Sequence, residues 1–347
     1  MAMAMASKLR VVSRMALIAV MALLTFVSGA WASLALWYQL PGRSITRTIG
    51  SLCWASLVVA LAVLAITLRS WLPLLAYAAC YAIVLLWWIG IAPSNRRIWA
   101  DDVSQLLTGT QHDNHVLLEH VRNFSWRREN DYDIHWETRE YDLDRLLSAD
   151  AVLSYWSSQA IAHAMISFGF DDGRHVVFSV EIRKRRGQQY SPIGGFFKQY
   201  ETVLVAADEN DIIRVRTNVR GEDDYLYPLR MEKSAMRALF LSYVHAANQL
   251  VARPAFYNTF TSNCTTLVYR MARQIDPGLP WDSRLLLTGY LPGYLYQVGA
   301  LGRDVPLDIL RQRGRITERA RATQPGDDFS DAIRRGMDST APTSSGH

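Results

Sequence analysis

The sequence is poor in cysteine and has long stretches without a single charged side chain. Only 3 of its 347 residues are cysteine, which excludes a scaffold held together by disulfides. Half of the residues are hydrophobic and 11 are tryptophan, so the composition is not that of a disordered or collagen-like chain. The net charge of +5 is modest, and neither a nucleic-acid-binding motif nor a glycine-rich phosphate loop is visible. We therefore expect no nucleic acid partner and no cofactor.

Three stretches in the first 95 residues contain no Lys, Arg, Asp or Glu. A helix needs about 20 apolar residues to cross a bilayer, and each stretch reaches that length. Because three such runs follow one another, buried core helices are a poor explanation for them. We predict transmembrane helices near residues 15–38, 48–68 and 71–92.

The chain is therefore expected to have three parts. Residues 1–95 would form a membrane anchor, and residues 96–320 a single soluble domain, for which this length is typical. Residues 321–347 are mostly polar, and we predict a disordered tail there. Nearly every charge, and all eight histidines, lie outside the anchor.

The start of the chain indicates on which side of the membrane the domain lies. The basic residues that flank the three predicted helices divide four against four, so the positive-inside rule gives no orientation. The basic residues up to Arg14, the apolar run behind them and the segment Ala30-Trp31-Ala32 resemble a signal sequence. Cleaved or not, such a segment places its far end outside the cytoplasm, and two further crossings return the chain there. We predict a multi-pass anchor in the cytoplasmic membrane and an extracytoplasmic domain.

The soluble section reads first as strands and then as helices. Apolar runs and alternating patterns predict strands at residues 116–126, 135–143, 151–156, 160–170, 175–184, 200–206 and 212–216. Helical spacing follows at residues 231–251 and from residue 264 to about residue 273, and residues 285–301 are typical of short helices. Strands followed by helices predict an α+β domain with an antiparallel sheet.

Cys264 is the cysteine outside the anchor, and it has no disulfide partner within the domain. Ser262 or Asn263 is a good N-cap for the helix that begins there, which places the thiol in the first helical turn. Backbone N–H groups and the helix dipole stabilise a thiolate at that position, as a nucleophilic cysteine requires. A small, buried and unreactive cysteine is the alternative. An exposed thiol outside the cytoplasm is otherwise an oxidation liability, which favours catalysis.

A nucleophilic thiol needs a base, and His163 is the candidate. It is a polar residue within the apolar run 161–170, where burial without a partner would be costly. A hydrogen-bonded core histidine, with no part in chemistry, is the alternative.

A third member depends on the turn Asp171-Asp172-Gly173. If these residues form a three-residue hairpin loop with glycine last, paired positions sum to 344 and His163 faces Glu181. The carboxylate would then orient the imidazole, and Ser167 and Ser179 would line the same face of the sheet. If the loop has two residues, the register slips by one and Ile182 faces His163 instead.

The other histidines form no metal-binding pattern. His112, His115 and His120 lie close together in the sequence, but they lack an HExxH motif or a cysteine pair. We therefore expect no metal site.

The domain resembles the Lnb N-terminal periplasmic domain family of bacterial envelope proteins. The resemblance runs from about residue 112 to residue 300. It is carried by residues 121–124, 136–139, 153–156, 161–163, 167–170, 190–192, 196–200, 220–222, 257–258 and 263–266.

The resemblance implies a permuted papain-like or NlpC/P60-like thiol fold, in which the histidine precedes the cysteine. Cys264 would be the nucleophile and His163 the base, with Asn263 and Tyr190 as supporting residues. The family is named for lipoprotein intramolecular transacylases, which move an acyl chain within a lipoprotein. By resemblance, the substrate would be a membrane lipid or a lipoprotein.

Three functions remain open from the sequence. The first is a membrane-anchored cysteine acyltransferase or hydrolase that forms a thioester on Cys264. The second is a peptidoglycan amidase or endopeptidase, which would need a polar, open cleft. The third is a binding or assembly module of the cell envelope without catalysis, for which Cys264→Ala would have no effect.

Overall fold

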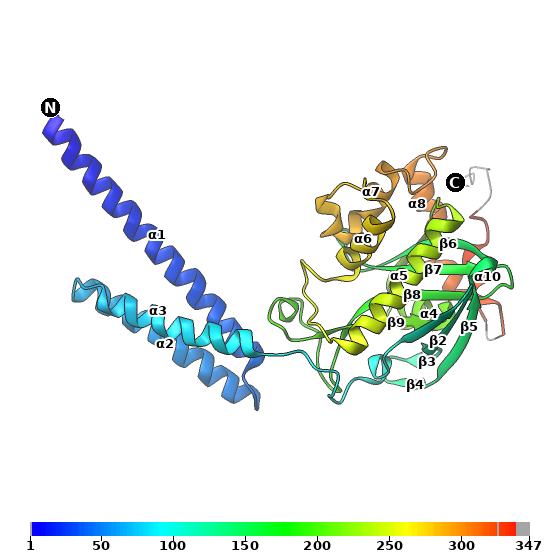
Figure 1. The fold of residues 1–347 in the computed structure, drawn as a ribbon, viewed down its shortest axis with the longest axis horizontal. Coiled ribbons are helices and arrows are strands. Elements are labelled where there is room, and N and C mark those ends of the chain that lie inside the picture. Colours follow the sequence, from blue (N-terminus) through cyan, green and yellow to red (C-terminus); the bar gives the residue numbers. More distant parts are fainter. Residues whose placement is uncertain (1, 325, 338–347) are drawn as a thin grey trace, which may run out of the picture. The chain divides into compact units, whose positions relative to one another are not determined.

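The computed structural model describes residues 2–324 and 326–337. The chain divides into two compact units. Figure 1 colours the chain along the sequence, from blue at the N-terminus to red towards the C-terminus. Of the described residues, 2–93 and 191–199 form the first unit, and 94–190, 200–324 and 326–337 form the second.

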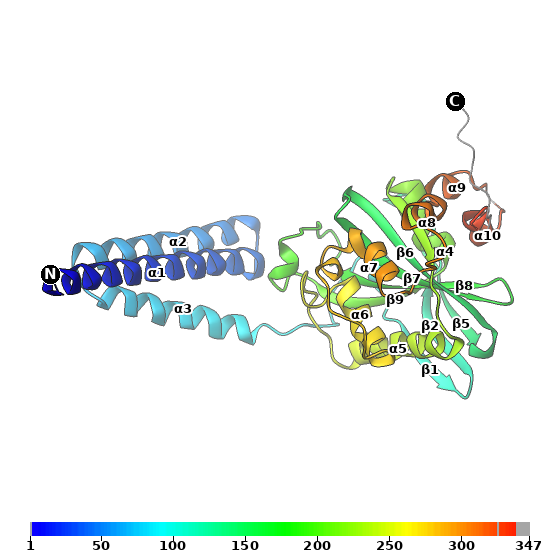
Figure 2. The ribbon, with the colours of Figure 1, turned by 90° about the horizontal axis from the view of Figure 1, so that it is seen from above.

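The first unit contains helices α1 (Ala2–Gln39), α2 (Ser44–Thr67) and α3 (Leu72–Gly90), which pack side by side (Figure 2). Within these helices, residues 15–39, 44–67 and 72–90 are long and apolar enough to cross a membrane. Their shared core includes Ala32, Trp54 and Tyr77. Many other large apolar side chains of these helices are exposed. The prediction of three transmembrane helices is confirmed by their length and composition.

The segment 191–199 is an unexpected part of this first unit. The ring of Phe197 stacks on Tyr38 with centroids 5.5 Å apart, and Gln39 donates to the Phe197 carbonyl over 2.6 Å. The ammonium group of Lys198 donates to the carbonyl of Trp88, near the end of α3, over 2.7 Å. The prediction that residues 1–95 form the anchor did not include this loop from the middle of the sequence.

The second unit is built on an eight-stranded sheet within residues 94–324. The strand order is β1-β2-β9-β8-β7-β6-β10, with β5 also paired to β2, and all pairs except β2–β9 are antiparallel. The strands are β1 (Thr108–His112), β2 (His115–Arg122), β5 (Trp136–Asp142), β6 (Leu146–Ser158), β7 (Ile161–Phe170), β8 (His175–Arg183), β9 (Glu201–Ala207) and β10 (Asp223–Pro228). A separate hairpin consists of β3 (Ser125–Arg128) and β4 (Asp131–Asp133).

Helices cover both faces of this sheet (Figures 1 and 2). On one face, α5 (Lys233–Ala252), α6 (Cys264–Ile275) and α7 (Leu291–Gln297) bury apolar side chains against the larger core. On the other face, α4 (Glu209–Arg214), α9 (Thr317–Arg321) and α10 (Phe329–Arg334) pack on a second core. The expected α+β class with three preceding apolar helices is confirmed.

The strand predicted at residues 212–216 is wrong. Asp208 caps a helix there, because its carboxylate accepts from the Asn210 amide over 3.0 Å. Helix α4 continues directly into a π-helical turn, η4 (Val215–Val219). Ile212, Ile213 and Val215 are buried in this helical segment. An apolar run this short fits a strand as well as a helix, which explains the wrong prediction.

The expected disordered tail also differs from the structure. Residues 329–334 form α10, in which Phe329 and Ile333 are buried in the second core. They lie four residues apart, so one face of a short helix is apolar. The last part of the predicted tail, residues 338–347, lies outside the described residues.

Candidate active site

The hairpin β7–β8 has the register that places Glu181 opposite His163. Met165 pairs with Ser179 and Gly169 with His175, so that paired positions sum to 344. The Phe170 amide donates to the Arg174 carbonyl over 3.0 Å across the loop, and Gly173 takes a φ of 82°. The loop therefore has three residues, and the alternative register is excluded.

The His163 imidazole is held by two groups of β8. Its Nε2 atom lies 2.7 Å from the Ser179 hydroxyl oxygen and 3.1 Å from the Glu181 Oε1 atom. The Ser179 hydroxyl itself donates to Glu181 Oε1 over 2.8 Å. These contacts fix the orientation of the ring and leave Nδ1 as the ring nitrogen that can face another partner.

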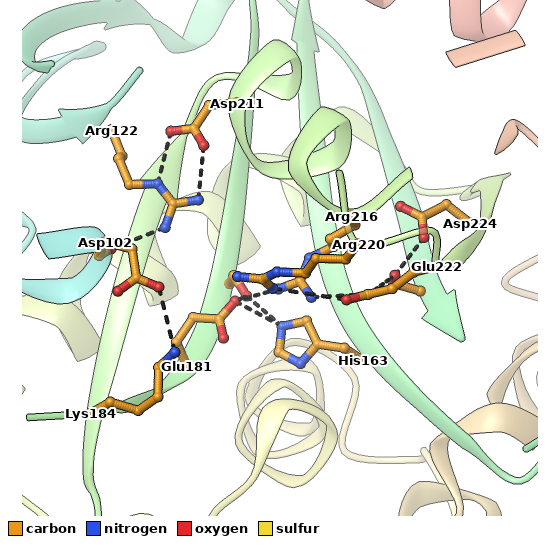
Figure 3. A network of polar contacts seen from close by, with 12 residues as sticks. Asp102, Arg122, His163, Glu181, Lys184, Asp211, Arg216, Arg220, Glu222 and Asp224 are labelled. Atoms are coloured by element: carbon orange, nitrogen blue, oxygen red, sulfur yellow. Dashed lines mark hydrogen bonds and ion pairs between the residues drawn. The ribbon is translucent and has the colours of Figure 1, made fainter. Parts of the chain in front are cut away.

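Arg216, from the π-helical turn η4, also binds Glu181. Arg216 donates to Glu181 Oε1 over 2.7 Å and lies 3.4 Å from Glu222, and its side chain is only 7 % exposed (Figure 3). Burial works to raise the pKa of Glu181, but His163 and Arg216 together hold it well below its ordinary value. Glu181 is therefore a carboxylate, and it stabilises a protonated imidazole beside it.

The network continues behind Arg216 to Ser154 and Asp224. The Ser154 hydroxyl contacts Glu222 and lies 2.5 Å from Asp224. Burial raises the pKa of Asp224 to about 7, so this carboxyl group can carry a proton near neutral pH. One hydroxyl has a single hydrogen. When Asp224 is protonated, the Ser154 hydroxyl can therefore accept a hydrogen bond from Asp224 and donate its own hydrogen to Glu222.

Cys264 is the first residue of α6, and Asn263 is its N-cap. The Asn263 side chain accepts from the amides of Thr265 and Thr266 over 2.9 and 2.8 Å, and the Thr266 hydroxyl accepts from the Asn263 amide. This capping box fixes the first turn. The thiol is 6 % exposed and therefore sits within the domain at a helix N-terminus, where a thiolate is stabilised.

The thiol and the imidazole act on each other. Burial works to raise the pKa of Cys264, but the charge of His163 and a side-chain hydrogen bond with it lower that pKa. Burial likewise works to lower the pKa of His163, yet the carboxylate of Glu181 raises it to about 9. Both shifts favour a thiolate–imidazolium pair at neutral pH.

The two groups meet where the β7–β8 pairing ends. His163 and Glu181 lie on the α4 side of the sheet, whereas α6 covers the other side. The backbone pairing stops at Met165 and Ser179, and the next amide, that of Ala164, donates to the Cys264 sulfur and lowers its pKa further. The open end of the hairpin thus brings sulfur and imidazole together.

A largely apolar cavity of about 330 Å³ has Cys264 among its lining residues. Cys264 and Thr265 form part of its wall, and the rest comes from the sheet and from the helices that cover it. Apolar pockets of this size with a few polar groups at one point are typical of small-molecule sites.

The other predicted supporting residues lie at different places. Ser262 is not the cap; it pairs with Asn258 through the backbone in the preceding loop. Burial and the charge of Cys264 raise the pKa of Tyr190, so this phenol lies near the thiol. Ser167 is not at the site, because it donates to Glu209 over 2.5 Å further along the sheet.

Sequence reasoning missed Arg216, which binds Glu181, and Glu222, which binds Arg216. Arg216 lies 35 positions after Glu181 in a segment that we predicted as a strand. The Asp208 cap would have indicated a helix there, but nothing local indicates its partner. Among the residues that the structure describes, no group of three or more His, Cys, Asp or Glu side chains could hold a metal.

The structure thus defines a membrane-anchored protein with an α+β domain, in which a cysteine, a histidine and a glutamate converge. Residues 132–289 match the family model described as Lnb N-terminal periplasmic domain. The match covers less than the predicted range of 112–300, but it includes Cys264, His163 and Glu181. No curated protein and no solved structure matches the chain.

Proposed function

We propose that this protein is a membrane-anchored cysteine acyltransferase or acyl hydrolase at the outer face of the cytoplasmic membrane. Cys264 is the nucleophile, His163 the general base and acid, and Glu181 the group that orients His163. The observation that carries the proposal is the Cys264–His163–Glu181 arrangement, of which Cys264 lies in the wall of an apolar cavity.

The first half of the reaction forms a thioester. The Cys264 thiolate attacks the carbonyl carbon of an ester, and a carbon–sulfur bond forms. As the tetrahedral intermediate collapses, the carbon–oxygen bond of the ester breaks. The His163 imidazolium gives its proton to the leaving alkoxide and becomes neutral.

The second half of the reaction releases the acyl group. An amine or a water molecule attacks the thioester carbonyl and gives a proton to the neutral imidazole of His163. The carbon–sulfur bond breaks, and the thiolate–imidazolium pair returns. An amine acceptor makes the enzyme a transferase, and water makes it a hydrolase.

The chemistry of the cavity favours a lipidic substrate over a cell-wall peptide. A peptidoglycan amidase needs a polar cleft for sugars and charged peptides. The cavity with Cys264 in its wall is instead lined mostly by alanine, leucine, valine and other apolar side chains, and its charged residues are Arg230, Glu232 and Asp276. The apolar helices of the anchor keep the domain at a bilayer, and tethering raises the effective concentration of a membrane substrate.

The test is acylation of Cys264 in intact membranes by an alkyne-tagged fatty ester. We expect label on Cys264 that neutral hydroxylamine removes, as it removes thioesters. The His163→Ala variant should be present in the membranes at the same amount as the wild type but should carry no label. If Cys264 takes no label and reacts only slowly with iodoacetamide, the proposal is wrong and a non-catalytic module is favoured.

The side of the membrane has its own test. Alkaline phosphatase fused after residue 337 should be active, because it folds only outside the cytoplasm. A green fluorescent protein fusion at the same position that fluoresces in the cytoplasm would contradict the proposed location.

A further inference from the structure

The apolar cavity follows helix α6 along its length. The side chains that α6 contributes include Cys264, Val268, Ala272 and Ile275, and Asp276 lines the cavity at the end of the helix. These positions are spaced by four, four and three residues, so they form one face of the helix. The reactive sulfur therefore lies at one end of the cavity and the last turn of α6 at the other.

Small side chains create the space in front of this face. Ala151 and Ala164 of the sheet and Ala235 of α5 line the wall of the cavity, where larger residues would fill it. Apolar residues of η5 (Ser283–Leu285) and α7, such as Leu291 and Leu295, form another part of the wall, and Arg230 and Glu232 also line it. The result is an apolar space that begins at a nucleophile.

The length of this space can be estimated from the helix. A helix rises about 1.5 Å per residue, so Val268, Ala272 and Ile275 lie about 6, 12 and 16 Å beyond Cys264 along the axis. An extended chain gains about 1.2 Å per bond, since a residue of three bonds spans up to about 3.6 Å. A distance of ~16 Å therefore holds roughly 13 bonds.

We propose that the cavity binds one long acyl chain of the substrate and that α6 measures its length. This inference rests on the proposed function, because it is the carbonyl bonded to Cys264 that starts the measurement. Ala272 sets the depth that medium-length chains can reach, and Ile275 marks the end of the space. The acyl donor is thus a lipid with at least one chain of roughly 12 to 16 carbons, not a short acyl or aminoacyl group.

The experiment measures how fast activated esters of 4, 8, 12 and 16 carbons acylate Cys264 in the full-length, detergent-solubilised protein. The readout is the intact mass of the protein before and after treatment with neutral hydroxylamine. In the wild type we expect the rate to rise up to 12 or 16 carbons. Ala272→Trp should keep the wild-type rate with 4 carbons and lose at least about tenfold with 16, a size typical of steric discrimination in a pocket.

Two further variants test the direction of the measurement. Ile275→Ala should extend the optimum to longer chains. Gln274→Trp is the matched control, because it adds the same side chain to the exposed face of α6 and does not line the cavity. It should leave the chain-length profile unchanged. Ala272→Leu replaces Ala272→Trp if the larger side chain prevents folding, and it should shorten the optimum by a smaller step.

The outcomes separate this inference from the proposed function. If no ester of any length acylates Cys264, the proposed function fails and the inference fails with it. If Cys264 is acylated but wild type and both Ala272 variants show the same profile, the function stands and the measuring role of α6 is wrong. A profile that shifts equally in Gln274→Trp would also overturn it.

Discussion

Two buried ionic networks lie on the same face of the sheet, and they differ in what they border. In the first, Arg216 joins Glu181 and Glu222 beside His163. In the second, Arg334 of α10 joins Asp150 and Glu209, with distances of 2.8 and 2.7 Å. Each has one arginine between two carboxylates, and a serine of the β7–β8 hairpin donates to one carboxylate in each.

The difference lies in whether a thiol stands beside the network. In the Arg334 network, Asp150 is 4 % exposed and Glu209 is fully buried, and both meet a permanent cation. Burial works to raise the pKa of Glu209, but Arg334 lowers it to about 2, so this carboxylate stays charged. In the Arg216 network the carboxylate faces the imidazole of His163, which interacts with the thiol of Cys264, and Cys264 in turn lies in the cavity wall. Buried charge alone therefore indicates stability, and a titratable neighbour beside a nucleophile indicates function.

The largest expected effect comes from replacing the thiol of Cys264, which lies beside the Arg216 network and not beside the Arg334 network. Cys264→Ser keeps the size of the side chain but replaces the thiolate by a weakly acidic hydroxyl. We expect the rate of ester turnover to fall at least ~1,000-fold, as for the loss of a catalytic nucleophile. Thermal unfolding should stay within a few degrees of the wild type, which serves as the control. Turnover that survives in this variant would refute the role of Cys264.

The two arginines provide a matched pair of variants. Arg216→Met and Arg334→Met each leave two buried carboxylates without their cation, so each should lower the free energy of unfolding by about 3 kcal/mol. Urea unfolding measures this loss. Activity per folded molecule should fall only in Arg216→Met, because Arg334 touches no group of the site. Equal losses of specific activity would show that the distinction between the networks is not functional.

The acidity of the pair can be tested through the pH profile. The reactive form needs the thiolate of Cys264 and the imidazolium of His163. As pH increases, kcat/KM should therefore rise when the thiol of Cys264 loses its proton, and it should fall when the imidazolium of His163 loses its proton at about pH 9. Glu181→Gln removes the carboxylate that raises the pKa of His163. The alkaline limb should then move to lower pH, because the imidazolium loses its proton earlier. A limb that stays near 9 would exclude Glu181 as the cause.

Local patterns in the sequence predicted those parts of the site that local chemistry determines. The Asp171-Asp172-Gly173 loop determines the register of its own hairpin, and Asn263 caps the helix that follows it. Arg216 could not be found in this way, since a buried ion pair over 35 positions leaves no periodic signal. Residues 191–199 also pack on distant aromatic rings, which no pattern in the loop itself indicates.

The smallest expected effect concerns the two serines of the β7–β8 hairpin. Ser179 and Ser167 are both buried, and each donates to a carboxylate that an arginine also binds. Replacing either by alanine removes the hydrogen bond to its carboxylate, and that loss should cost about 1 kcal/mol of stability. The two losses, measured by urea unfolding, should be similar.

The catalytic consequences of the two serine variants should nevertheless differ. Ser179 also lies 2.7 Å from His163 Nε2, so Ser179→Ala leaves the ring held on that side by Glu181 at 3.1 Å. The imidazole is then oriented less firmly, and kcat should fall several-fold with little change in KM. Ser167→Ala changes a carboxylate that Arg334 still binds, and its kcat should match the wild type. If both variants lowered kcat alike, general loosening of the hairpin would explain the effect, and the contact of Ser179 with His163 would have no role of its own.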